Sequence, residues 1–111
     1  MATPFPPDTP ADISVFFENG KYIFRVETQS IYVYDRDKTG VPTCVAECAR
    51  LWSPVIASSD AKPVGEWTLV KRADGAQQWR YRKRPIYTYT RDTPGATSGN
   101  GVDGVWHLVT P

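Results

Sequence analysis

A chain of 111 residues is long enough for one ordinary domain with a small core, so we expect a single domain. Its 13 basic and 12 acidic side chains nearly balance, which excludes an electrostatic nucleic-acid binder, and no apolar run approaches the roughly eighteen residues of a membrane span. Ten prolines, eight glycines and 13% aromatic residues favour short strands joined by defined turns, so the composition predicts a mainly β fold.

The N-terminal segment is rich in proline and shows no periodicity of apolar residues. We predict a disordered stem over residues 1–11 and a single β domain over residues 12–111. A Pro-rich stem of this kind suits a protein that is tethered to a membrane or follows another domain.

The first strands of the domain are predicted by the alternation of apolar and polar residues. Apolar residues alternate over 13–17 and again over 22–26, on either side of Asn19-Gly20. This pattern predicts a β-hairpin with a two-residue turn. Residues 31–35 predict a third strand, with Tyr32 and Tyr34 on one face and Ile31 and Val33 on the other.

The same organisation occurs a second time at a fixed offset of 55 residues. The segment IYVYDRDKTG at 31–40 recurs as IYTYTRDTPG at 86–95, and Trp52 recurs as Trp106 at an offset of 54. A supersecondary unit used twice shares a core, because one copy alone rarely buries its apolar face. We therefore predict two tandem three-stranded antiparallel meanders, at about 12–56 and 66–110, packed as one small domain.

The two copies differ between the third strand and the tryptophan. In the first, Thr43 can cap a short helix around residues 44–51, with Cys48 and Trp52 at helical spacing. In the second, the glycine-rich run 95–104 predicts a loop. A final strand is expected over 105–109.

Two Tyr-x4-Asp motifs, Tyr32 to Asp37 and Tyr87 to Asp92, occur with Cys44-x3-Cys48 and with a Gly-Val-x-Gly-Val-Trp-His run that ends at His107. This set resembles the paired motif of bacterial secreted proteins and lipoproteins described as a secreted repeat of unknown function, over about 13–109. The resemblance implies a periplasmic, secreted or outer-surface lipoprotein with a possible lipid anchor upstream in the precursor, and no established activity. We accordingly expect a non-enzymatic binding or scaffold module of the cell envelope, with an envelope protein or a small ligand as its partner and no cofactor.

The compartment implied by the resemblance favours a disulfide between Cys44 and Cys48. Residues four apart on a helix hold their Cβ atoms about 5–6 Å apart, against about 3.8 Å in a disulfide, so either Cys44 lies outside the helix or the bridge is strained. Two alternatives keep both thiols reduced: a soft-metal site, for copper in particular, with His107 as third ligand, and dithiol redox chemistry.

The repeated tyrosines and aspartates have a structural and a catalytic interpretation. A carboxylate that accepts from a tyrosine hydroxyl ties a strand to the turn that follows it, and repetition favours this structural role for Tyr32, Asp37, Tyr87 and Asp92. The repeat-related Trp52 and Trp106 are expected in the core with the other tryptophans. With His107 as the single histidine, no catalytic triad is evident, and we expect no enzyme.

The densest charge lies at residues 80–84. Trp79, Arg80, Arg82, Lys83 and Arg84 can form a shallow binding patch for an anionic headgroup, a glycan or a partner. The alternative is the solvated turn of a hairpin whose cations block an exposed edge.

Overall fold

The computed structural model describes residues 8–111. The predicted stem therefore lies mostly outside the described residues. Within them, Pro10 is buried and its carbonyl accepts a hydrogen bond from the Ile13 amide at 3.0 Å, so the last part of that segment packs on the domain.

The described part of the chain is mainly β with one short α-helix, as the sequence predicts. Short elements of this kind suit a chain with many turn residues. The elements in chain order are β1 (Ser14–Glu18), β2 (Lys21–Val26), β3 (Gln29–Ser30), β4 (Tyr32–Tyr34), α1 (Glu47–Leu51), β5 (Trp52–Pro54), β6 (Ile56–Ala57), β7 (Trp67–Lys71), β8 (Gln77–Tyr81), β9 (Arg84–Tyr89), the 3₁₀ turn η1 (Val102–Gly104) and β10 (Trp106–Leu108).

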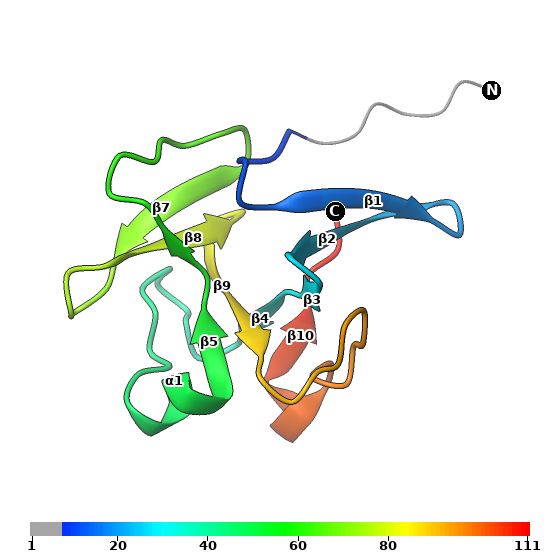
Figure 1. Ribbon diagram of the computed structural model, residues 1–111. Coiled ribbons are helices and arrows are strands. Elements are labelled where there is room, and N and C mark those ends of the chain that lie inside the picture. The colour runs from blue at the N-terminus through cyan, green and yellow to red at the C-terminus, as the bar shows by residue number, and fades with distance from the viewer. Residues whose placement is uncertain (1–7) are drawn as a thin grey trace.

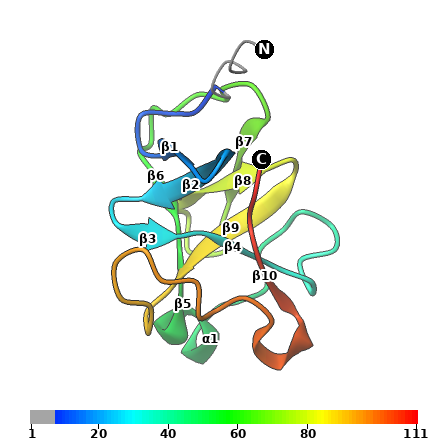
Figure 2. The same cartoon turned by 90° about the vertical axis from the view of Figure 1, so that its right-hand side faces the viewer.

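The strands form two antiparallel sheets (Figure 1). The smaller sheet has the order β1-β2-β3, and its β1–β2 hairpin extends away from the body of the molecule. The larger has the order β10-β4-β9-β8-β6, with β5 also paired to β9 and β7 to β8. Seen from the side, the chain crosses from one sheet to the other along β3 and β4 (Figure 2).

The predicted hairpin is present. Glu18 pairs with Lys21, and the two residues between them have φ values of 53° at Asn19 and 78° at Gly20. Positive φ at both central positions is the geometry that the Asn-Gly dipeptide favours. Phe24 lies where the hairpin joins the rest of the domain and is buried, whereas Phe17 lies near the tip of the hairpin and is half exposed.

Both repeats form the predicted meander, as β1-β2-β3 and as β7-β8-β9. In each repeat only the start of the third strand pairs within the repeat, and its continuation crosses over: β4 pairs with β9 and β10, and β9 pairs with β4 and β5. Residues Ile31, Tyr32 and Val33 are all buried. A strand that is apolar on both faces needs cover on both, and one hairpin cannot supply it.

A pseudo-twofold axis relates the two repeats and passes between β4 and β9, where Tyr32 pairs with its own counterpart Tyr87. On either side, each repeat lends its last strand to the other. Trp52 of β5 pairs with Tyr89, and Trp106 of β10 pairs with the equivalent Tyr34. The repeats are therefore interlocked, and neither forms its central sheet alone.

Two clusters of buried side chains hold the domain. One is mixed aliphatic and aromatic and lies between the sheets; it comprises Ile13, Phe24, Ile31, Val33, Val55, Ala57, Trp67, Trp79, Tyr81, Ile86 and Val109. The other is mostly aromatic and lies on the axis; it comprises Tyr32, Cys44, Trp52, Tyr87, Tyr89 and Trp106. The expectation that all four tryptophans belong to the core is confirmed.

The helix is shorter than predicted and its cap differs. It spans Glu47–Leu51, its N-cap is Ala46, and no side chain caps it. Thr43 does not cap the helix, because its hydroxyl donates to Asp37 instead, at 2.6 Å. In the second repeat, the predicted glycine-rich loop contains the single 3₁₀ turn Val102–Gly104.

Candidate functional site

The repeated tyrosines and aspartates meet across the pseudo-twofold axis. The Tyr32 hydroxyl donates to Asp92 Oδ2 at 2.5 Å, and the Tyr87 hydroxyl donates to Asp37 Oδ2 at 2.9 Å. We expected each tyrosine to bind the aspartate of its own repeat, and that pairing is wrong. Each binds the aspartate of the other repeat, so the motif is a reciprocal lock between the two copies.

The other oxygen of each aspartate is used within its own repeat. Asp37 Oδ1 accepts from the amide and hydroxyl of Thr43, at 2.7 and 2.6 Å. Asp92 Oδ1 accepts from the amide of Ser98 at 3.0 Å and from its hydroxyl. Thr43 and Ser98 are 55 residues apart, so they extend the repeat, and the sequence analysis missed them.

Both locks are buried, since Asp37 is 4% and Asp92 6% exposed. Burial, followed by the hydrogen bond and charge of Asp92, raises the pKa of the Tyr32 hydroxyl well above its usual value. Burial, followed by the charge of Asp37, does the same to the pKa of Tyr87. Both phenols therefore hold their protons to higher pH than an ordinary tyrosine and donate to the buried carboxylates.

Four aromatic rings stack across the axis beside these locks. Trp52 and Trp106 lie face to face, with ring centroids 3.7 Å apart and planes 3° from parallel. Tyr89 stacks on the outer face of Trp52 at 4.1 Å, and Tyr34 stacks on Trp106 at 4.2 Å. The repeat-related tryptophans thus form the centre of a continuous stack that joins the two copies.

The structure joins Cys44 and Cys48 in a disulfide. Cys44 lies outside the helix, three residues before Glu47, so the bridge is not constrained to helical spacing, and its Cα atoms are 5.1 Å apart. That separation is usual for a disulfide. The bridge closes the loop between Asp37 and the helix, next to the stacked tryptophans.

The structure does not bring His107 to the cysteines as a metal-ligand set. His107 Nε2 lies 2.7 Å from Asp35 Oδ2, and this contact, helped by Arg84, lowers the pKa of the Asp35 carboxyl. Within residues 8–111, no group of three or more His, Cys, Asp or Glu side chains is close enough to hold a metal ion.

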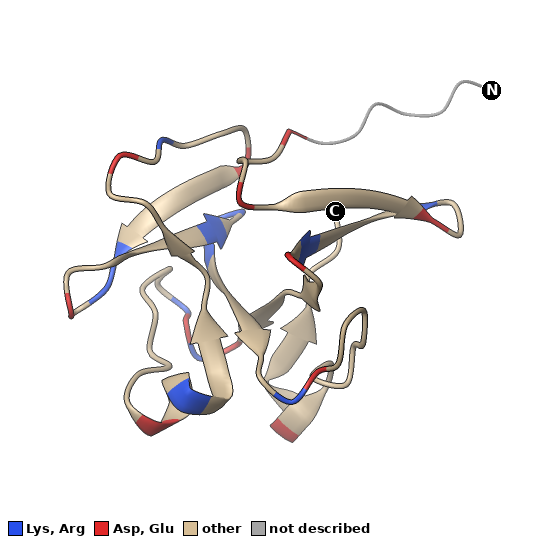
Figure 3. Ribbon diagram, in the orientation of Figure 1, with Lys and Arg blue, Asp and Glu red and all other residues tan. Residues whose placement is uncertain are grey.

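The side chains of the predicted binding patch differ in exposure. Trp79 is 2% exposed and its indole donates to Asp12 at 3.2 Å, so it belongs to the core and not to a surface patch. Arg82, Lys83 and Arg84 are exposed at the β8–β9 turn. Figure 3 shows Lys and Arg gathered at the end of β8 and the start of β9. Arg80 is partly buried and donates to the Gly40 carbonyl at 3.3 Å and to the Thr68 hydroxyl at 3.1 Å.

Sequence reasoning also missed a buried arginine. Arg72 is 8% exposed; it donates to Gln78 Oε1 at 2.7 Å and to the Cys44 carbonyl at 3.4 Å. Gln78 in turn donates to the Ile86 carbonyl at 2.8 Å. These bonds tie the disulfide loop to β8 and β9. In the first repeat, the equivalents of Arg72 and Gln78 are Phe17 and Ile23, so no periodic signal marked them.

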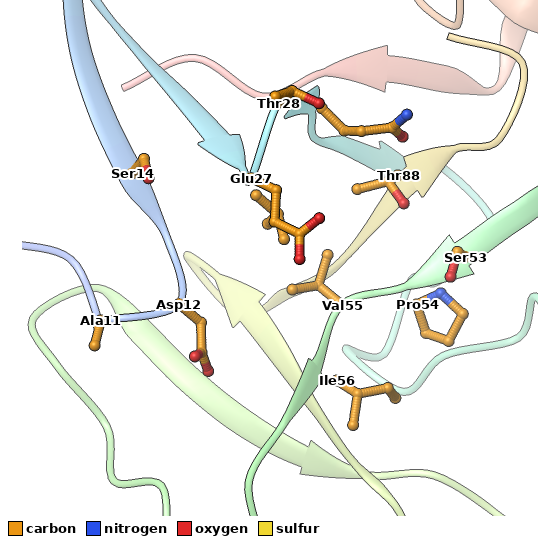
Figure 4. A pocket seen from close by; sticks show the side chains of 12 residues that line it. Ala11, Asp12, Ser14, Glu27, Thr28, Ser53, Pro54, Val55, Ile56 and Thr88 are labelled. Atoms are coloured by element: carbon orange, nitrogen blue, oxygen red, sulfur yellow. The ribbon is translucent and has the colours of Figure 1, made fainter. Parts of the chain in front are cut away.

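Two surface hollows are related by the pseudo-symmetry but differ in charge. One, of about 700 Å³, lies between the start of β1 and the β2–β3 turn, and Figure 4 shows Glu27 pointing into it toward Val55. The other, of about 210 Å³, lies beside β10. Glu27, Gln29 and Ser53 in the first stand where Arg82, Arg84 and His107 stand in the second.

The family model for a secreted repeat of unknown function matches residues 68–110. The family resemblance is confirmed over this segment. The matched segment is the second repeat, and its internal counterpart, about 13–56, forms the other half of the interlock. No curated protein and no solved structure matches the chain. No helix among the described residues is long and apolar enough to cross a membrane.

Proposed function

We propose that the chain is a non-enzymatic binding or scaffold module that works outside the cytoplasm, in the bacterial cell envelope. The observation that carries this proposal is the reciprocal lock. The groups that suggested catalysis, Tyr32, Asp37, Tyr87 and Asp92, are buried and hydrogen-bonded to one another in two equivalent copies. An active site has no need of two equivalent copies, whereas an interlock between two repeats does.

Two further observations support the location. The matched family is described as secreted, and the structure joins both cysteines in a disulfide. Disulfides persist in oxidising compartments and are rare in the cytosol. A periplasmic or outer-surface lipoprotein carried on a lipidated stem fits both observations.

The proposal also accounts for where the repeats differ. The lock and the aromatic stack are nearly symmetric, whereas the turns on the surface carry different charges, Glu27 in one repeat and Arg82 in the other. In a duplicated scaffold the core is retained for folding, and binding specificity develops on the exposed loops.

The test is a panel of envelope components offered to the purified protein: anionic and zwitterionic lipid headgroups, peptidoglycan fragments and neutral glycans. Each compound is scored twice, by the shift in the melting temperature of the protein and by its own NMR spectrum after prolonged incubation. The proposal predicts a compound that raises the melting temperature and is recovered unchanged. Turnover of any compound, abolished in Asp37→Asn or Asp92→Asn at temperatures where that variant is folded, would contradict it.

A further inference from the structure

The surface beside the lock carries a strongly basic hollow. It has a volume of about 610 Å³ and lies between the loop that follows β4 and the β8–β9 turn. Its cationic lining residues are Lys38, Arg80, Arg82, Lys83 and Arg84. The pseudo-symmetric counterpart has a volume of about 260 Å³ and is lined by Phe16, Arg25, Glu27, Thr28, Pro94 and Gly95.

The positive charge of the basic hollow is only partly neutralised. Arg82 pairs with Glu66 at 2.9 Å, and Arg84 pairs with Asp35 at 3.2 Å. Asp37 also lines the hollow, but both of its oxygens are occupied by the lock and by Thr43. Among the described residues, neither Lys38 nor Lys83 takes part in an ion pair.

The fold does not require these cations. In the counterpart turn, Glu27 has a φ of 57°, close to the 49° of Arg82, so a residue of opposite charge supports the same backbone there. Lys83 has a φ of 69°. Residues other than Gly, Asn and Asp are disfavoured in that region, so local conformation does not explain the lysine. Arg80 is the one cation of the hollow that is matched by a cation, Arg25, in the other repeat. Arg80 also donates a hydrogen bond to the Gly40 carbonyl.

We propose that this hollow binds a phosphate-type polyanion, either a free pyrophosphate-like group or the phosphorylated headgroup of a lipid. Arginine guanidinium groups fit phosphate oxygens in pairs, and lysines add point charges, so a mixed cluster around a concave surface suits a group with two or more negative charges. The volume falls in the range of small-molecule sites. This inference rests on the proposed function, because it names the ligand class of a binding module.

The other repeat provides two of the replacement residues for a variant that removes the positive charge. Lys38→Thr and Arg84→Gln introduce the residues that stand at the equivalent positions, Thr93 and Gln29. Lys83→Asn removes the third charge and accepts a positive φ. Arg80 and Arg82 are left in place to keep their contacts with Gly40 and Glu66. The matched control, Lys62→Thr with Lys71→Gln and Arg91→Gln, removes three exposed charges outside the hollow.

The probes are inorganic pyrophosphate, titrated by calorimetry and by amide chemical shifts, and vesicles of phosphatidylglycerol compared with phosphatidylcholine. We expect one pyrophosphate per chain, shifts at residues 38–40 and 82–84, and an affinity that falls with added salt. The triple variant should bind about tenfold or more weakly, whereas the control stays close to the unmodified protein. Loss of phosphatidylglycerol binding in the triple variant assigns the ligand to a lipid headgroup, and binding of pyrophosphate alone assigns it to a soluble anion.

The inference is overturned if neither probe binds the unmodified protein, or if the triple variant and the control lose affinity equally. That outcome leaves the proposed function standing, because neutral ligands in the panel can still bind. Hydrolysis of pyrophosphate, by contrast, would overturn the proposed function.

Discussion

Removal of one tyrosine hydroxyl tests whether the tyrosine binds the aspartate of its own repeat or that of the other repeat. Tyr32→Phe keeps the ring that packs edge-on against Trp52 but deletes the donor to the buried Asp92 carboxylate and the acceptor of the Gly99 amide. A hydrogen bond to a charged group contributes about 1.5–3 kcal/mol, so we expect the free energy of unfolding to fall by that amount. Tyr87→Phe should cost a similar amount, since its bond to Asp37 is the pseudo-symmetric equivalent.

Double-mutant cycles then separate the two ways of pairing the motif. The pair Tyr32→Phe and Asp92→Asn should show a coupling energy of about 1 kcal/mol or more, because the residues are bonded across the axis. The pair Tyr32→Phe and Asp37→Asn, from the same repeat, should be additive within about 0.5 kcal/mol. Urea unfolding followed by tryptophan fluorescence and circular dichroism measures the four free energies of each cycle. Strong coupling within one repeat, with additivity between repeats, would refute the reciprocal lock.

The pKa values of Tyr32 and Tyr87 are raised, so the folded state holds these phenolic protons to higher pH than the unfolded chain. The two tyrosines should therefore leave the free energy of unfolding unchanged below about pH 10 and lower it above about pH 10. Urea unfolding between about pH 8 and pH 11 checks this, and a slope that is unchanged in Tyr32→Phe would contradict it. Gly99→Ala should cost about 1–3 kcal/mol, because a Cβ there would lie 2.9 Å from ring atoms of both Trp52 and Tyr32. A melting temperature equal to that of the unmodified protein would show that the rings can move apart. Reduction of the Cys44–Cys48 bridge should lower stability by about 2 kcal/mol or less, because the closed loop is short, and the reduced protein should keep its sheet signal in circular dichroism. Complete unfolding on reduction would mean that the bridge contributes more than loop closure.

Much of the fold was accessible from alternation and from the repeat. The hairpin around Asn19-Gly20 follows from local turn chemistry and holds in the structure. The pairing of β4 with β9 could not be predicted, because the repeat shows that Tyr32 and Tyr87 are equivalent but not that their strands pair. For the same reason the repeat does not show which aspartate each tyrosine contacts. The strands β5 and β6 were missed because they are two or three residues long and interrupted by proline and serine, too short for any periodicity to register.

The residues that hold the lock aspartates carry a repeat signal of their own. Thr43 and Ser98 are both hydroxyl residues at the repeat offset, six residues after their aspartates, and that spacing suits a turn closed by a side chain on backbone. Thr43 also fits a helix cap, because a threonine before an apolar periodic run is a usual start of a helix. Trp79 was placed in the surface patch by its neighbours in sequence, although its strand parity with Tyr81 points into the core.

The most direct test of the interlocked fold is the state of one repeat alone. Residues 66–111, expressed without the first repeat, lack the partners of Tyr87, Tyr89 and Trp106. The account predicts no folded monomer: sedimentation velocity with amide NMR should show either an unfolded chain or a symmetric homodimer in which two copies rebuild the axis. A monomer with well-dispersed amide signals would contradict it, because the second repeat would then complete its own core.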